Sequence, residues 1–140
     1  MNAEIQAAYA MIAAGDLTGA EARLEVALRD PSLTAGDRAQ AFAYLSRSYR
    51  LAGRRADALR TARDASVISV VADDERIRAY ADDALGHAAI DVYLADNRVP
   101  ELLYEGTQAL ERATEAYQRV GAIEMVAYLT DLRARISTAP

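Results

Sequence analysis

The segment from Phe42 to Ala65 constrains the fold more than any other part of the chain. Its first half places apolar side chains at helical spacing on one face, at Phe42, Leu45, Tyr49 and Ala52. Gly53 follows, and glycine ends a helix readily because it adopts a left-handed backbone conformation at no steric cost. The second half carries small residues along one edge, at Ala58, Ala62 and Ala65, and such an edge lets two helices approach to about 8–10 Å. The segment therefore predicts a helical hairpin whose apolar face needs neighbouring helices.

The same signal occurs thirty-eight places earlier, at Gly15, Ala20, Leu24 and Ala27. A weaker copy lies sixty-eight places after Tyr49 and Gly53, at Tyr117 and Gly121. A period of about 20–50 residues is typical of proteins built from stacked repeats. The spacing therefore predicts several hairpins that bury one another's apolar faces.

These residues resemble the tetratricopeptide repeat (TPR) family. The family pattern is matched by Phe42, Leu45, Ser46, Tyr49, Gly53, Ala58, Ala62 and Ala65, with a departure at Ala62, where the family usually has a larger residue. The first repeat keeps Ala8, Met11, Gly15, Ala20, Leu24 and Ala27, with Pro31 near the end of its second helix. The resemblance is strongest over 38–65, covers 3–31 in part, and is degenerate beyond 75.

The resemblance implies an all-α fold, a right-handed α-solenoid of about three helical hairpins followed by a C-terminal capping helix. We place one domain over 1–140, hairpins at about 2–30, 35–69 and 74–119, and the cap at 122–136. In an alternative pairing, the last two helices form a repeat in register with Tyr49 and Gly53. Residues 67–71 would suit a strand, but no partner strand exists elsewhere in the chain, so we expect the apolar end of a helix.

The amino-acid composition excludes several classes of function. The chain has no cysteine, which excludes disulfides and thiolate chemistry and is compatible with the cytoplasmic location that we expect. Its net charge is −5, which argues against a nucleic-acid surface, since phosphate binding needs clustered positive charge. No apolar run approaches the roughly 20 residues that span a membrane. We expect no cofactor.

The family lines its concave groove with the first helices of successive hairpins, and that groove binds peptides or helices of partner proteins. Carried across by register, the groove residues here are Asn2, Tyr9, Ile12, Arg47, Arg50, Tyr80, Asp83, His87 and Asp91. Helical spacing also places Arg47 and Arg50 opposite Leu45 and Tyr49, away from the hairpin seam. The resemblance therefore implies a non-enzymatic adaptor that holds an acidic or carboxylate group of a partner protein.

Three alternatives remain open from the sequence. Arg47 and Arg50 have a plainer interpretation as surface arginines paired with nearby acids. His87, with Asp83 and Asp91 at helical spacing, would suit a small enzyme or a metal protein, although one helix supplies only part of a metal shell and the chain has no second histidine. A regulatory or sensor module would instead act through a small ligand or self-association, with residues 67–71 covering the open end of a symmetric dimer.

Overall fold

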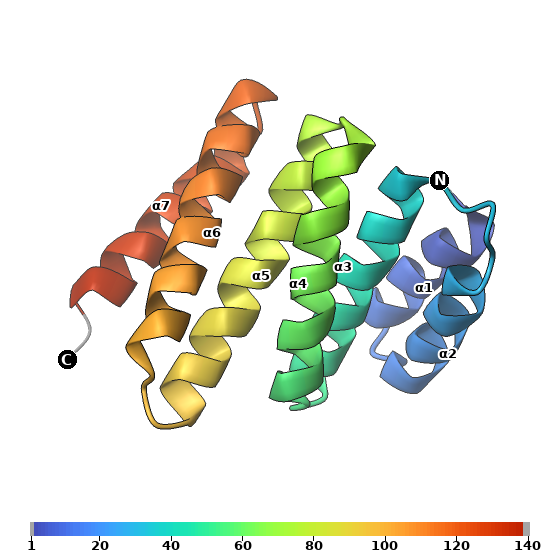
Figure 1. Ribbon diagram of the computed structural model, residues 1–140, viewed down its shortest axis with the longest axis horizontal. Helices are drawn as coiled ribbons and strands as arrows, with labels where there is room; N and C mark the ends of the chain where they lie inside the picture. The colour runs from blue at the N-terminus through green and yellow to red at the C-terminus, as the bar shows by residue number, and fades with distance from the viewer. Residues whose placement is uncertain (1, 139–140) are drawn as a thin grey trace.

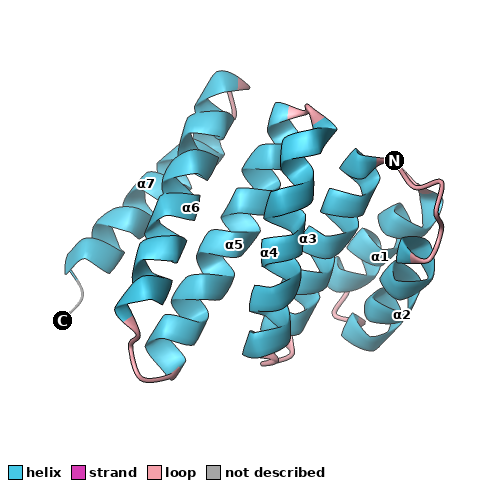
Figure 2. Ribbon diagram, in the orientation of Figure 1, coloured by secondary structure: helices cyan, strands magenta, loops and turns pink. Residues whose placement is uncertain are grey.

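The computed structural model describes residues 2–138, and within this range the chain forms helices and no strands. The all-α prediction is confirmed (Figure 2). The helices are α1 (Ala3–Ala13), α2 (Leu17–Leu28), α3 (Ala35–Leu51), α4 (Arg55–Ala72), α5 (Glu75–Ala95), α6 (Pro100–Arg119) and α7 (Ile123–Thr138).

Polar side chains start the helices where the sequence places them. Thr34 caps α3, because its hydroxyl accepts the Asp37 amide at 3.0 Å. Asp74 caps α5, because its carboxylate accepts the Arg76 amide at 2.9 Å. Asp73 instead ends α4 in the left-handed region, with φ of 53°. Pro100 lies in the first turn of α6, where its missing amide costs no hydrogen bond.

Three of the connections share one glycine turn. Gly15, Gly53 and Gly121 all have positive φ, of 86°, 78° and 73°. In each turn the amide after the glycine donates to a carbonyl five residues back, and the glycine amide donates to one three residues back. The turn recurs between α1 and α2, between α3 and α4, and between α6 and α7. The α5–α6 connection differs, since Arg98 holds the positive φ there, at 51°.

The helices lie in a row from the α1–α2 end to α7 (Figure 1). Each helix packs against the next one in the chain, and α1, α3 and α5 also contact one another in succession. Alanine lines the α3–α4 seam, where Ala58, Ala62 and Ala65 are fully buried. Small side chains therefore bring these helices close, as predicted.

The α5–α6 crossing is closer still, because glycines face each other there. A β-carbon on Gly86 would collide with the Leu110 side chain and would lie 3.2 Å from the Gly106 carbonyl oxygen. One on Gly106 would lie 2.8 Å from Ile90 Cδ1. The two backbones thus occupy space that any side chain at these positions would need.

Residues 67–71 are helical, as expected, and α4 continues past the predicted end near Ser69 to Ala72. Their valines at 67, 70 and 71 remain largely exposed. None of the described helices is both long enough and apolar enough to cross a lipid bilayer.

Candidate functional site

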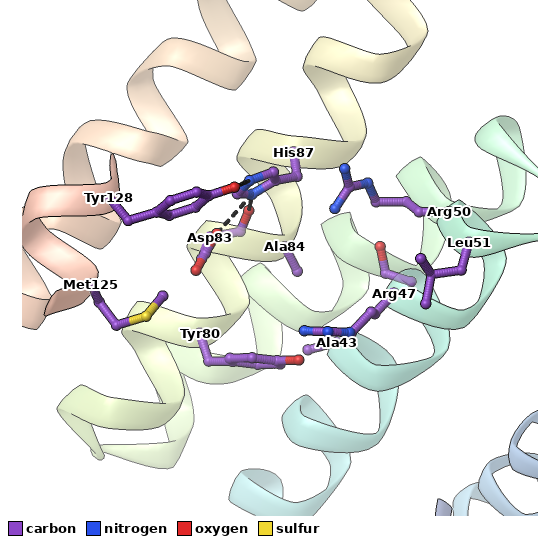
Figure 3. Close-up of a pocket in the computed structure, with 11 residues that line it drawn as sticks. Ala43, Arg47, Arg50, Leu51, Tyr80, Asp83, Ala84, His87, Met125 and Tyr128 are labelled. Atoms are coloured by element: carbon purple, nitrogen blue, oxygen red, sulfur yellow. Dashed lines mark hydrogen bonds and ion pairs between the residues drawn. The ribbon is translucent and has the colours of Figure 1, made fainter. Parts of the chain in front are cut away.

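A cleft of about 440 Å³ lies between α3, α5 and α7 (Figure 3). Helix α3 contributes Ala43, Ser46, Arg47, Arg50 and Leu51, α5 contributes Tyr80, Asp83, Ala84 and His87, and α7 contributes Met125 and Tyr128. Five of the predicted groove residues therefore meet in one place: Arg47, Arg50, Tyr80, Asp83 and His87. We call this space the α3–α5–α7 cleft.

Arg47 is the exposed cation of the cleft. Across residues 2–138 no carboxylate lies within ion-pairing distance of its guanidinium. The group lies close to the hydroxyl of Tyr80. Burial raises the pKa of Tyr80 to about 12, although the Arg47 cation opposes part of that shift. The phenol is therefore neutral near pH 7, and the charge of Arg47 is available to a ligand.

Arg50 is different, because its charge is already compensated. Its Nε donates to Asp91 Oδ2 at 2.7 Å, and both side chains are about one-third exposed. The plainer interpretation as a paired arginine therefore describes Arg50 but not Arg47. Asp91 does not line the cleft, and its link to the cleft is the ion pair with Arg50.

A hydrogen-bonded chain runs from the core into the cleft through Asp83 and His87. The Tyr117 hydroxyl donates to Asp83 Oδ2 at 3.1 Å, and burial together with this carboxylate raises the pKa of Tyr117. His87 Nδ1 lies 2.7 Å from Asp83 Oδ1 and 3.0 Å from the Asp83 carbonyl oxygen. Both neighbours are acceptors, so Nδ1 carries a proton.

The other nitrogen of His87 faces α7. Its Nε2 lies 3.3 Å from the Tyr128 hydroxyl, and the two rings stack with centroids 6.0 Å apart. An oriented imidazole of this kind is suited to proton transfer. Ser46, which also lines the cleft, donates its hydroxyl to the Ala58 carbonyl oxygen at 2.8 Å and is committed to the backbone. Within residues 2–138 no group of three or more histidine and acidic side chains could hold a metal ion.

Helix α1 contributes fewer residues to the cleft than predicted. Ile12 is 5% exposed and packs in the core with Ile5 and Ala8, so its assignment to the groove is wrong. These three side chains form one apolar stripe of α1, and burial of that stripe places Ile12 inward. Asn2 caps α1 by accepting the Glu4 amide at 2.8 Å.

Tyr9 lies outside the cleft but connects to it through aromatic contacts. Its ring centroid is 5.2 Å from that of Tyr44, and Tyr44 is 5.4 Å from Tyr80 in an edge-on arrangement. A row of tyrosines thus crosses α1, α3 and α5. It extends the cleft wall toward the first hairpin.

The sequence prediction missed the contribution of α7. Met125 and Tyr128 line the cleft, but the last helix was expected only to cap the fold. Their spacing of three residues on one helical face was an available signal. Comparison of the chain with models of protein families, with curated proteins and with solved structures finds no match.

Proposed function

We propose that the chain is a non-enzymatic adaptor, a TPR-like right-handed solenoid whose α3–α5–α7 cleft holds an acidic segment of a partner protein. The observation that carries the proposal is Arg47, an exposed guanidinium in a cleft with no carboxylate partner among the described residues. A guanidinium binds a carboxylate through two parallel hydrogen bonds, which gives both orientation and energy.

The packing supports the solenoid part of this proposal. Contacts from α1 to α3 and from α3 to α5 are what stacking of successive hairpins in one direction produces. The glycine turns after α1, α3 and α6 have matching hydrogen bonds, as expected of repeated units.

The remaining cleft residues suit a peptide rather than a lone anion. Leu51 is largely exposed beside Arg47, and Met125 and Tyr128 face it from α7. Such side chains offer apolar contacts, and methionine adapts its shape to different ligands. The ligand that fits is a short segment with an acidic residue next to an aliphatic or aromatic one.

Selection from a random peptide library tests this function. We expect peptides enriched in Asp or Glu beside an apolar residue, whose affinity is then measured by fluorescence polarisation. Arg47→Ala should weaken binding about tenfold or more, since a hydrogen bond between charged groups contributes about 1.5–3 kcal/mol. Arg55→Ala is the matched control, because Arg55 is also exposed and unpaired among the described residues but lies outside the cleft.

Two results would contradict the proposal. One is a selection that yields no acidic consensus. The other is an affinity that falls equally with Arg55→Ala, which would show that only the overall charge matters.

Self-association through α4 is a second candidate, favoured by its exposed valines. Val67, Val70 and Val71 are 70%, 63% and 76% exposed on one helix end. Apolar clusters of this kind mark interfaces more often than isolated surface residues do. Sedimentation velocity should then show a dimer that Val70→Glu/Val71→Glu dissociates, whereas a monomer at high concentration would exclude this candidate.

A further inference from the structure

The C-terminal end of α4 carries exposed valines and, next to them, an acidic residue without a partner. Asp73 ends the helix, and its side chain is exposed. No hydrogen bond or ion pair engages its carboxylate within residues 2–138, whereas Asp74 caps α5 and Glu75 forms an ion pair with α6. We call this surface the α4 tip, and it consists of Val70, Val71 and Asp73.

The α4 tip has the chemistry that the α3–α5–α7 cleft lacks. The cleft holds the guanidinium of Arg47, which has no carboxylate partner in the described part of the chain, beside the exposed side chain of Leu51. The tip offers a carboxylate without a cation, next to two valines that are 63% and 76% exposed. Each surface therefore supplies both the charge and the apolar contact that the other needs.

The α4 tip cannot fill the cleft of its own chain. The described walls of the cleft come from α3, α5 and α7, and no residue of α4 lines it. Helix α4 is held in the row by its buried alanine seam with α3 and by its packing against α5 (Figure 1). A second copy of the chain needs no rearrangement to present its tip, because the tip and the cleft are both open to solvent.

The size of the cleft suits the end of a helix. An α-helix is about 10–12 Å across with its side chains and rises 5.4 Å per turn, so one turn occupies roughly 400–600 Å³. The cleft has a volume of about 440 Å³, which is close to that of a single turn. The α4 tip is the last turn of α4 together with the residue that ends it, so its length matches the space.

We infer that a second copy of this chain is a partner of the cleft, with its α4 tip seated between α3 and α7. The carboxylate of Asp73 binds the guanidinium of Arg47. The two valines cover the apolar side chains of Leu51 and Met125. This inference rests on the proposed function, because it names the protein that supplies the acidic segment. Each copy carries both surfaces, so two copies can engage each other reciprocally.

Sedimentation velocity of the intact chain over a range of concentrations tests this inference. The unaltered chain should associate, and Arg47→Glu and Asp73→Arg should each weaken association about tenfold or more, because each sets like charges against one another. Glu25→Arg is the control and should leave association unchanged. Glu25 is likewise exposed, without a partner among the described residues and next to the exposed Val26, but it lies on α2. Circular dichroism confirms that each variant remains folded.

A mixture of the Arg47→Glu and Asp73→Arg variants separates this contact from a folding defect. In the mixture, the cleft altered by Arg47→Glu faces the tip altered by Asp73→Arg, and the unaltered cleft faces the unaltered tip. Opposite charges then meet at both junctions, so the mixture should associate about as strongly as the unaltered chain while each variant alone does not. A folding defect in either variant would not be reversed by mixing.

Four results would overturn the inference: a chain that remains monomeric at every concentration, association that survives Arg47→Glu, an equal loss in Glu25→Arg, or a mixture that associates no more than its components. The peptide selection tests the proposed function separately. Acidic peptides that bind a monomeric chain through Arg47 would overturn the second copy as partner and support the function of the cleft. A selection without an acidic consensus would contradict that function itself.

Discussion

Two adjacent carboxylates on α5 show how neighbouring residues serve different purposes. Asp82 and Asp83 are 3% and 8% exposed, and both need partners because a buried charge without them is strongly unfavourable. Asp82 accepts from the Ser66 hydroxyl at 2.8 Å and from Arg112 at 3.1 Å, and so joins α4, α5 and α6. Asp83, which itself lines the cleft, accepts from Tyr117 and His87, and His87 in turn contacts Tyr128 of α7.

The difference lies in the chemistry of the partners. Arg112 remains charged at all accessible pH values, so Asp82 has a permanent counter-charge. Asp83 has a phenol and an imidazole, whose hydrogen bonds orient a ring toward ligand-accessible space. The first carboxylate supports helix packing, and the second orients a side chain at the candidate site.

The largest expected effect comes from separating α6 from α5, which would remove a partner from both carboxylates. Gly86→Ala would place a methyl group against the buried Leu110 and the Gly106 carbonyl, and we expect a loss of about 3 kcal/mol in the free energy of unfolding. Urea denaturation measures this change. Gly36→Ala is the control, since its nearest neighbour is the end of the Ile77 side chain, and it should be nearly neutral. Equal effects of the two changes would show that the crossing is not tightly packed.

The next largest effect concerns the Asp82–Arg112 ion pair, whose two members should contribute unequally to the free energy of unfolding. Arg112→Ala leaves a buried carboxylate without its counter-charge, and we expect a loss of about 2 kcal/mol, even though Arg112 is half exposed. Asp82→Ala leaves an arginine that water can solvate, so it should lose only about 1 kcal/mol. A double-mutant cycle under urea denaturation measures both values, and the reverse order would contradict this account of Asp82.

A smaller effect is expected at Asp83. Tyr117→Phe removes the hydroxyl donor to Oδ2 without changing the ring, and we expect a loss of about 1–1.5 kcal/mol in the free energy of unfolding. Tyr104→Phe, at an exposed phenol, should change it by less than about 0.5 kcal/mol. Thermal unfolding of both variants provides the comparison, and indistinguishable midpoints would mean that the buried hydrogen bond contributes nothing.

The smallest expected change in stability comes from Asp83→Asn, which should nevertheless change the tautomer of His87 at the candidate site. Asp83→Asn should alter the free energy of unfolding by about 1 kcal/mol or less, while the proton of neutral His87 should no longer reside mainly on Nδ1. Nitrogen-15 NMR of the imidazole distinguishes the two tautomers. Asp82→Asn is the control and should leave the His87 spectrum unchanged. A His87 spectrum insensitive to Asp83→Asn would remove Asp83 from its orienting role.

Local features of this fold were predictable because they depend on neighbours in the chain. The left-handed turn at Gly53 follows from such short-range chemistry. The helical state of residues 67–71 was inferred differently, because their local pattern suits a strand and the lack of a partner strand elsewhere in the chain favoured a helix. The close approach of Gly86 and Gly106 depends on how two long helices cross, and no local pattern specifies that crossing.

The candidate site was predictable only in part for the same reason. Helical periodicity separated Arg47 from the hairpin seam, but it could not reveal that Arg50 pairs with Asp91, forty-one residues away. The position of α7 depends on packing against α6, so the spacing of Met125 and Tyr128 on one helical face could not by itself place them in the cleft. Ile12 was misassigned because its place was carried across by register from α3, whereas in α1 Ile12 belongs to the apolar stripe with Ile5 and Ala8 that packs in the core.

The linear order in which the helices pack determines how far local unfolding can spread. Within residues 2–138 the backbones of α1 and α2 come close to α3 and to no later helix, and the backbone of α7 comes close to that of α6 alone. An end pair can therefore fray while the centre remains intact, and amide hydrogens should exchange fastest at the two ends and slowest in α5. In a chain packed in this order, local unfolding at one end does not spread to the rest of the structure.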